Sequence, residues 1–116
     1  MARFRIKCRN FSDFYQSAKV PAGEYKRVFD LHVTGGYVAF IERKAHTWFS
    51  NTYYEFIVDG ELVEKIEYEV PVNAPRTINP PIVAEKRIEW WAYNNDSSEH
   101  LFEVICDGRL CKLVKI

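Results

Sequence analysis

Cysteine is scarce in this sequence, and its spacing excludes several classes of site. The chain has three cysteines, an odd number, and no two of them show the C-x-x-C spacing. We therefore expect no disulfide framework and no zinc site, and we interpret Cys8, Cys106 and Cys111 as small buried apolar residues. The three histidines are scattered without the spacing of paired metal ligands, so we expect no metal and no other cofactor.

Long apolar runs are absent as well. No stretch approaches the roughly 18 apolar residues of a membrane-spanning helix, so we expect no membrane insertion. The first residues, M-A-R-F-R-I-K-C-R, alternate charged and apolar side chains where a signal peptide would have an apolar core. This pattern indicates synthesis and folding in a cytoplasm.

Motifs of catalysis are missing too. There is no G-x-S-x-G nucleophile motif, and Gly35-Gly36 lacks the following helix and lysine of a phosphate-binding loop. Carboxylate pairs such as Glu67 and Glu69 have basic neighbours, which is typical of a solvated surface. We therefore expect a protein that is not an enzyme and has no catalytic residues.

Sixteen basic and sixteen acidic residues cancel, which argues against nucleic acid as a partner, including single strands bound by an OB-like fold. The two signs are separated along the chain. The first strand carries Arg3, Arg5, Lys7 and Arg9, whereas residues 55–69 are acidic with only Lys65 among the carboxylates. These segments are either solvated strand faces or complementary patches that meet between copies of the molecule.

Strand patterns fill the chain. Hydrophobic residues make up 47% of it and alternate with polar ones over short segments separated by turn residues. The expected strands cover residues 2–9, 24–34, 37–44, 53–58, 61–70, 82–93, 101–106 and 109–116. Tight hairpins are expected at Gly35-Gly36, Asp59-Gly60 and Asp107-Gly108.

Two long connections are expected, at residues 10–23 and 71–81. In the second, Pro80 and Pro81 remove two backbone donors, so a strand should begin only after them. That strand should place Ile88 and Trp90 in the core and Trp91 on the opposite face. The expected core anchors are Phe56, Ile88, Trp90 and Phe102, and in the first strand Phe4, Ile6 and Cys8 should face inward.

About eight short strands with two long connections favour an all-β fold, a two-sheet antiparallel β-sandwich of jelly-roll-like topology. An immunoglobulin-like sandwich is the second choice, weakened by the lack of its Cys-Trp-Cys pattern. Since 116 residues are too few for a core and a separate lobe, we expect residues 1–116 to form a single domain.

Three segments together resemble a known family. They are V-P-A-G-E-Y-K-R-V-F-D, F-I-V-D-G-E-L-V and P-P-I-V-A-E-K-R-I-E-W-W-A-Y-N-N-D-S-S. Their order resembles small jelly-roll domains of phage and virus particles, over roughly residues 20–106. The resemblance implies a virion structural or interaction module: a capsid decoration, adaptor or spike-base protein, or a receptor-binding one, located in the virion after synthesis in the host cytoplasm.

The expected partners are copies of the chain, as a closed homo-oligomer such as a trimer or as a ring on a particle, and other virion proteins. The interface candidates are Arg3, Arg5, Lys7, Arg9, Trp48, Phe49, Tyr53, Trp91 and Tyr93. The alternative assembly state is a monomer in which both faces of residues 82–93 are buried within one sandwich. The alternative function is a lectin-like or receptor-binding module that binds a glycan with its surface aromatics.

Overall fold

Nearly the whole chain is extended, as the alternation predicts. The computed structural model describes residues 2–116, and within them it contains nine β-strands. They are β1 (Phe4–Asn10), β2 (Tyr15–Val20), β3 (Tyr25–His32), β4 (Val38–His46), β5 (Thr52–Val58), β6 (Glu61–Ile66), β7 (Arg76–Ala84), β8 (Arg87–Asn94) and β9 (His100–Lys115). No helix long and apolar enough to cross a membrane occurs in these described residues.

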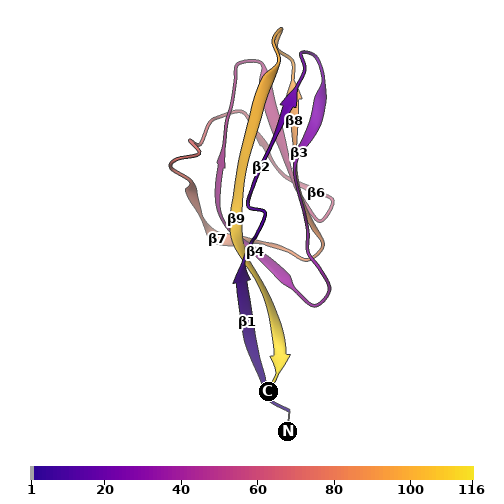
Figure 1. Ribbon diagram of the computed structural model, residues 1–116, viewed down its shortest axis with the longest axis vertical. Helices are drawn as coiled ribbons and strands as arrows, with labels where there is room; N and C mark the ends of the chain where they lie inside the picture. Colours follow the sequence, from indigo (N-terminus) through magenta and orange to yellow (C-terminus); the bar gives the residue numbers. More distant parts are fainter. Residues whose placement is uncertain (1) are drawn as a thin grey trace.

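The strands form two antiparallel sheets that pack against each other (Figure 1). One sheet has the order β1-β9-β4-β7, with β2 also paired to β9, and the other has the order β3-β8-β5-β6. Both β1 and β2 pair with β9, at its two ends, and act as one interrupted strand. With these two taken together, the pairs are nested: first with last, β3 with β8, β4 with β7, and β5 with β6. This nesting is the jelly-roll arrangement of one long hairpin rolled into a sandwich, so the predicted fold class is confirmed.

The innermost turn of the roll is the predicted hairpin at Asp59-Gly60, which joins β5 to β6. Both residues have positive φ, 54° at Asp59 and 83° at Gly60, as the favoured two-residue hairpin turn requires. The Asp59 carboxylate also accepts hydrogen bonds from the backbone N–H groups of Glu85, Lys86 and Arg87 at 2.8, 2.7 and 2.9 Å. The tip of the roll therefore fixes the turn between β7 and β8.

The other two predicted hairpins are wrong. Gly35-Gly36 joins β3 of one sheet to β4 of the other, so the two flanking strands are not paired. Asp107 and Gly108 lie inside β9, which runs unbroken from His100 to Lys115. A Cβ atom on Gly108 would lie 1.8 Å from the carbonyl oxygen of Phe40. Glycine is present there because β4 approaches closely, and not because the chain turns.

The two predicted long connections contain strands. Residues 10–23 include β2, in which Tyr15 to Val20 pair with β9. Phe11 is buried in the core, and after it the chain returns to the edge of the sheet and forms this strand. Pro80 and Pro81 lie within β7. The pairing of β7 with β4 changes register between Ile41 and Arg43, so residues 78–81 have no partner in β4. β7 is an edge strand, which tolerates missing donors. The predicted strand 82–93 is therefore two strands, β7 and β8, in different sheets.

The core lies between the two sheets and is centred on Trp90. This side chain is fully buried and stacks on Phe56 with ring centroids 4.5 Å apart. In β8, buried and half-buried residues alternate without a break, as the strand period predicts. The four expected anchors, Phe56, Ile88, Trp90 and Phe102, all have no exposed surface.

Candidate functional site

A two-stranded arm extends from the sandwich. It consists of residues 2–10 and 110–116, in which β1 pairs with the end of β9 from Phe4 with Lys115 to Arg9 with Leu110. Figure 1 shows both chain ends at the tip of this arm, and the molecule measures 63 × 25 × 20 Å. Every residue of β1 is exposed. The arm is thus the part of the chain best placed to contact another molecule.

The two faces of the arm are reversed relative to the expectation for the first strand. Leu110 points into the core, and its partner Arg9 lies on the same side. The basic residues of β1 therefore continue the inner face of the sheet beyond the end of the other sheet. Phe4, Ile6 and Cys8 lie on the outer face, so the prediction that they face the core is wrong. The alternation was detected correctly, but strand pairing decides which face is covered.

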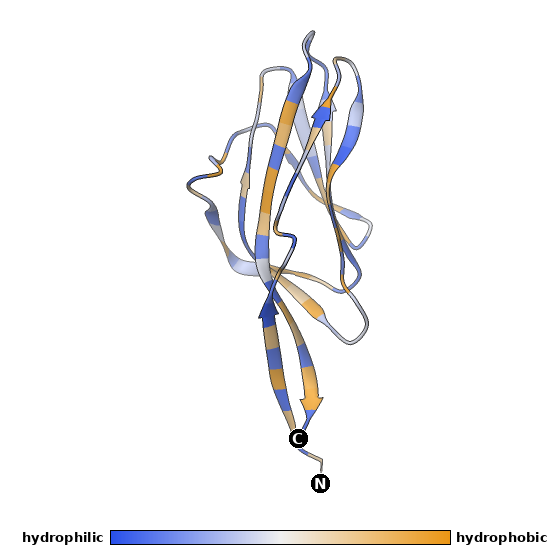
Figure 2. Cartoon of the chain, viewed as in Figure 1, coloured by the Kyte–Doolittle hydropathy of each residue, from blue (hydrophilic) through white to orange (hydrophobic). Residues whose placement is uncertain are grey.

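The outer face of the arm is open to solvent and largely apolar, with Lys115 beside Phe4 near its tip. Phe4, Ile6 and Leu113 are 59, 71 and 68% exposed, and Ile6 lies directly opposite Leu113. Hydrophobic and hydrophilic residues alternate along β1, and hydrophobic residues predominate at the end of β9 (Figure 2). At its root a hollow of about 350 Å³ is lined by Ile6, Gly36, Val38, Phe40, Cys111, Lys112 and Leu113. Contiguous exposed apolar surface of this kind commonly marks a contact.

A disulfide bond joins the two strands of the arm where they leave the sandwich. Cys8 and Cys111 face each other across the ladder and are bonded, so the prediction of no disulfide is wrong for these two residues. Their pairing joins positions 103 residues apart. Burial was predicted for all three cysteines and holds for Cys106 and Cys111, whereas Cys8 is exposed. Cys106 is free, and burial raises the pKa of its thiol to about 12. It is therefore not a nucleophile near neutral pH.

The inner face of the arm is basic. It carries Arg3, Arg5, Lys7 and Arg9 from β1 and Lys112 from β9. Near the root, the charged ends of Arg9 and Lys112 lie 5.2 and 4.7 Å from the centre of the Tyr37 ring. A hydrogen bond from Lys112 lowers the pKa of Tyr37. These cation–π contacts fix Arg9 and Lys112 at the root of the basic face. Arg3, Arg5 and Lys7, which lie nearer the tip of the arm, can pair with an acidic partner.

A second exposed surface has the opposite charge. The segment from Glu61 to Glu69, which we call the acidic edge, begins with β6, the last strand in its sheet. Its exposed residues are Glu61, Leu62, Val63, Lys65, Glu67 and Glu69. Leu62 and Val63 are 57 and 46% exposed. The acidic edge therefore combines carboxylates with apolar side chains on a strand whose outer side is unpaired in the described chain.

Three of the predicted interface aromatics lie together on the outer face of the other sheet. The Tyr53 and Tyr93 rings are parallel with centroids 4.6 Å apart, and Tyr25 stacks on the far side of Tyr93 at 5.2 Å. Trp91 lies 6.0 Å from Tyr25. The amine of Lys65 covers the second face of Tyr53 at 4.4 Å. Both faces of the Tyr53 and Tyr93 rings are therefore covered by neighbours, whereas Tyr25 at the end of the stack is 63% exposed.

The remaining predicted aromatics, Trp48 and Phe49, do not join this column. Both are half-buried in the loop between β4 and β5. The Trp48 Nε1 donates to the Thr52 carbonyl at 2.9 Å, and Phe49 stacks on His100 with centroids 4.1 Å apart. Phe49 therefore closes one end of the core, whereas Trp48 lines a hollow of about 460 Å³ with Asn51, Thr52, Tyr53, Lys65, Glu67 and Asn95.

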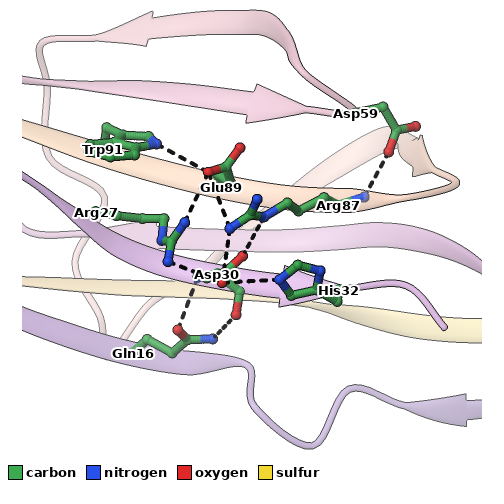
Figure 3. Close-up of polar contacts among 8 residues, drawn as sticks. All are labelled: Gln16, Arg27, Asp30, His32, Asp59, Arg87, Glu89 and Trp91. Atoms are coloured by element: carbon green, nitrogen blue, oxygen red, sulfur yellow. Dashed lines mark hydrogen bonds and ion pairs between the residues drawn. The ribbon is translucent and has the colours of Figure 1, made fainter.

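An ion network on β3 and β8 went undetected by sequence reasoning (Figure 3). Asp30 accepts from Arg87 Nε and Nη2 at 2.8 and 3.3 Å, and Arg27 lies 3.5 Å from both Asp30 and Glu89. The hydrogen bond from Arg87 lowers the pKa of Asp30. Asp30 is thus held as an ion, which does not suit proton transfer near neutral pH.

The same network joins the two sheets. The Gln16 side chain, from β2, donates to the Asp30 carbonyl at 2.9 Å and accepts from the Asp30 backbone N–H at 3.0 Å. The Gln16 amide thus bonds the backbone of Asp30 as a neighbouring β-strand would, and it connects two strands that belong to different sheets. We interpret the network as structural. Its signal in the sequence, opposite charges on neighbouring strands, becomes visible only once β3 is known to pair with β8.

Two buried polar residues, Lys44 and His46, lie next to each other on β4. His46 has no exposed surface and is surrounded by the rings of Tyr54, Tyr68 and Trp90, whose centroids lie 5.4 to 5.5 Å from that of the imidazole. Beside it the Lys44 amine donates to Glu64 at 2.9 Å and to Tyr68 at 2.7 Å. Within residues 2–116, no three His, Cys, Asp or Glu side chains are grouped to hold a metal ion.

The arm and the acidic edge are therefore the two surfaces whose chemistry is not satisfied within the described chain. They contain the four basic candidates predicted from the sequence, but the exposed apolar side chains of the arm were missed. The signal for them is the largely apolar segment at the other terminus, L-C-K-L-V-K-I, whose only charged residues are two lysines. No protein-family model matches this chain, and no curated protein is significantly similar to it.

Proposed function

We propose that the protein is a non-enzymatic structural module of a virus particle, a capsid decoration, adaptor or spike-base protein, that attaches to neighbouring proteins through its arm. The observation that carries the proposal is the arm itself. It presents exposed Phe4, Ile6 and Leu113 on one face and cations on the other, outside the sandwich. Such a surface is costly for a protein that acts alone, because it invites association.

The jelly-roll architecture is compatible with a structural role in a virus particle. Jelly-roll sandwiches occur among viral capsid and lectin domains, although one fold can serve many functions. The disulfide at the root of the arm supports a docking role, because a tethered arm loses less conformational freedom on binding than a loose one. The groups that could have supported catalysis, Asp30 and Cys106, are respectively held in ion pairs and fully buried.

Particles purified from cells that produce them test the proposal. We expect the tagged chain at a fixed ratio to the capsid proteins in quantitative mass spectrometry. The variant F4S/I6S/L113S, which removes the apolar face of the arm, should be lost from the particles while its sandwich still folds. The control V83S/L101S changes apolar residues that are 49 and 44% exposed elsewhere and should be incorporated normally. Absence of the wild-type chain, or equal incorporation of both variants, contradicts the proposal.

Carbohydrate binding is a second candidate, favoured by the hollow beside Trp48 and Tyr53. Amide and charged side chains of Asn51, Lys65 and Asn95 line it together with these aromatics, a combination suited to sugars. It is the weaker candidate because Tyr93 and Lys65 cover both faces of the Tyr53 ring. A glycan array separates the two: a sugar hit that Trp48→Ala abolishes and F4S/I6S/L113S retains supports the second candidate.

A further inference from the structure

We infer that the arm of one copy binds the acidic edge of a second copy, so that the protein assembles head to tail. This inference rests on the proposed function in one respect, that the arm is a docking element. It adds the identity of the partner, the surface that the partner supplies and the type of symmetry.

Charge separation within the chain carries the first step. The arm contains six basic residues, Arg3, Arg5, Lys7, Arg9, Lys112 and Lys115, and its sequence contains no acidic residue. Because the whole chain has sixteen residues of each sign, the remaining residues hold ten basic against sixteen acidic ones. The arm is thus formally +6 and the rest of the chain −6. An arm meeting another arm would bring like charges together, whereas an arm meeting another copy's body would neutralise them.

The acidic edge is the part of the body that best matches the arm. Between residues 59 and 70 the sequence has five acidic residues and one basic residue, Lys65. Two of the five are already engaged: Asp59 caps the turn before β8, and Glu64 pairs with Lys44. Glu61, Glu67 and Glu69 remain exposed, and within residues 2–116 their one ion pair joins Glu67 to Lys65 at 3.4 Å. These three carboxylates are available to the basic face of an incoming arm.

Apolar and backbone groups match as well. Leu62 and Val63 on the acidic edge are exposed, as are Phe4 and Ile6 on the arm. Both β1 and β6 are edge strands of their sheets. An edge strand has a free row of backbone donors and acceptors, so one edge can extend the other by strand addition. The contact would therefore join complementary charge, apolar surface and unpaired backbone in one place.

The two surfaces differ, so the contact is heterologous. A heterologous contact gives a closed ring when the rotation between copies closes, and an open filament when it does not. The inference therefore names the two surfaces that would meet in the expected ring or trimer. The competing arrangement is an isologous dimer in which the arms of two copies bind each other.

Exchange of charges between the surfaces tests the inference. One variant, R3E/R5E/K7E, reverses the charge at three positions of the basic face of the arm, and another, E61K/E67K/E69K, reverses the three exposed carboxylates of the acidic edge. In sedimentation at low salt, the wild-type chain should associate, and each variant alone should bind itself on the order of tenfold more weakly or not at all. A mixture of the two variants should regain association, because the reversed arm of one fits the reversed edge of the other.

Control variants that change the net charge in the same two directions, K19E/K26E and E24K/E99K, alter exposed residues on other elements and should associate like the wild type. If the edge variant alone still associates, the contact is between arms and the inference is overturned. It is also overturned if the wild type stays monomeric, including the case in which its arm binds an oligonucleotide instead. If the chain stays monomeric and is still incorporated into particles through its arm, this inference fails while the proposed function stands.

Discussion

Cys8 and Cys111 are bonded across directly opposed positions of β1 and β9, with their Cα atoms 4.1 Å apart. The bond lies at the root of the arm, between the exposed pair Ile6–Leu113 and the pair formed by Arg9 and the buried Leu110. It therefore joins the two chain ends at the point where the sandwich ends and the arm begins.

Removal of this bond should destabilise the whole chain. The link closes a loop spanning 103 positions, and a cross-link of this kind restricts the unfolded chain. We expect C8S/C111S to lose about 2 to 4 kcal/mol of unfolding free energy. Urea unfolding with and without a reducing agent measures this loss. The reducing agent should have no effect on the double variant, and an unchanged wild-type midpoint after reduction would show that the bond does not contribute.

Trp90 and Trp91 are neighbours in sequence with opposite surroundings. Trp90 is fully buried against Phe56, so Trp90→Ala should cost about 3 to 5 kcal/mol or unfold the protein. Trp91 is half-exposed on the outer face, and Trp91→Ala should cost about 1 kcal/mol. Denaturant unfolding followed by circular dichroism compares the two. Equal losses would mean that the faces of β8 are assigned wrongly.

Local patterns predicted the elements better than their pairing. Alternation in β5 and β8 identified the buried positions, because each of these strands has one face on the core. The turn at Asp59-Gly60 was predictable because both residues need positive φ. Gly35-Gly36 and Asp107-Gly108 look the same in the sequence, yet the first joins two sheets and the second lies within a strand.

The candidate site was predicted only in part for the same reason. The basic residues of β1 were visible as a pattern, but their exposure depends on pairing with β9 at the other end of the chain. The Cys8–Cys111 bond also depends on that pairing. In a nested topology nearly all strand partners are distant in sequence, and no local signal selects between them.

The close approach of β4 to Gly108 gives a further prediction. Gly108→Ala would place a methyl group 1.8 Å from the Phe40 carbonyl oxygen, so the two strands must separate. We expect a loss of about 3 kcal/mol. Gly35→Ala is the matched control, since nothing lies within 4 Å of its Cβ position, and it should change stability by at most about 0.5 kcal/mol. Thermal unfolding of both variants measures the difference, and a stable Gly108→Ala protein would contradict the close contact.

The Asp59 carboxylate should matter more than a surface charge does. It accepts three backbone hydrogen bonds from the turn between β7 and β8, and although burial opposes ionisation, these bonds lower its pKa. Asp59→Ala removes the acceptor and also the tolerance for positive φ, so we expect a loss of about 2 to 3 kcal/mol. Asp59→Asn keeps one acceptor oxygen and should lose about half as much. Chemical denaturation ranks the two, and the reverse order would contradict the capping role.

The buried His46 should make the protein sensitive to mild acid. Burial, and secondarily the nearby Lys44, lower the pKa of His46 from 6.5 to about 4. Glu64 raises it in part and Arg76 lowers it further. Between these two pH values the unfolded chain binds a proton that the folded chain excludes. The stabilisation is therefore complete above about pH 6.5 and is lost progressively as the pH falls to about 4, by about 3 kcal/mol in total.

The His46→Phe variant separates this effect from that of the carboxylates. Asp30, Asp59 and Glu64 also have lowered pKa values, but their contribution is lost mainly below their ordinary values of 3.8 to 4.5. The pH range from 6.5 to 5 therefore reports chiefly on the histidine. Urea unfolding across this range should show a falling stability for the wild type and a nearly constant one for His46→Phe, because phenylalanine fits among the same rings and has no proton to bind. Equal slopes for the two proteins would mean that His46 is protonated in the folded core.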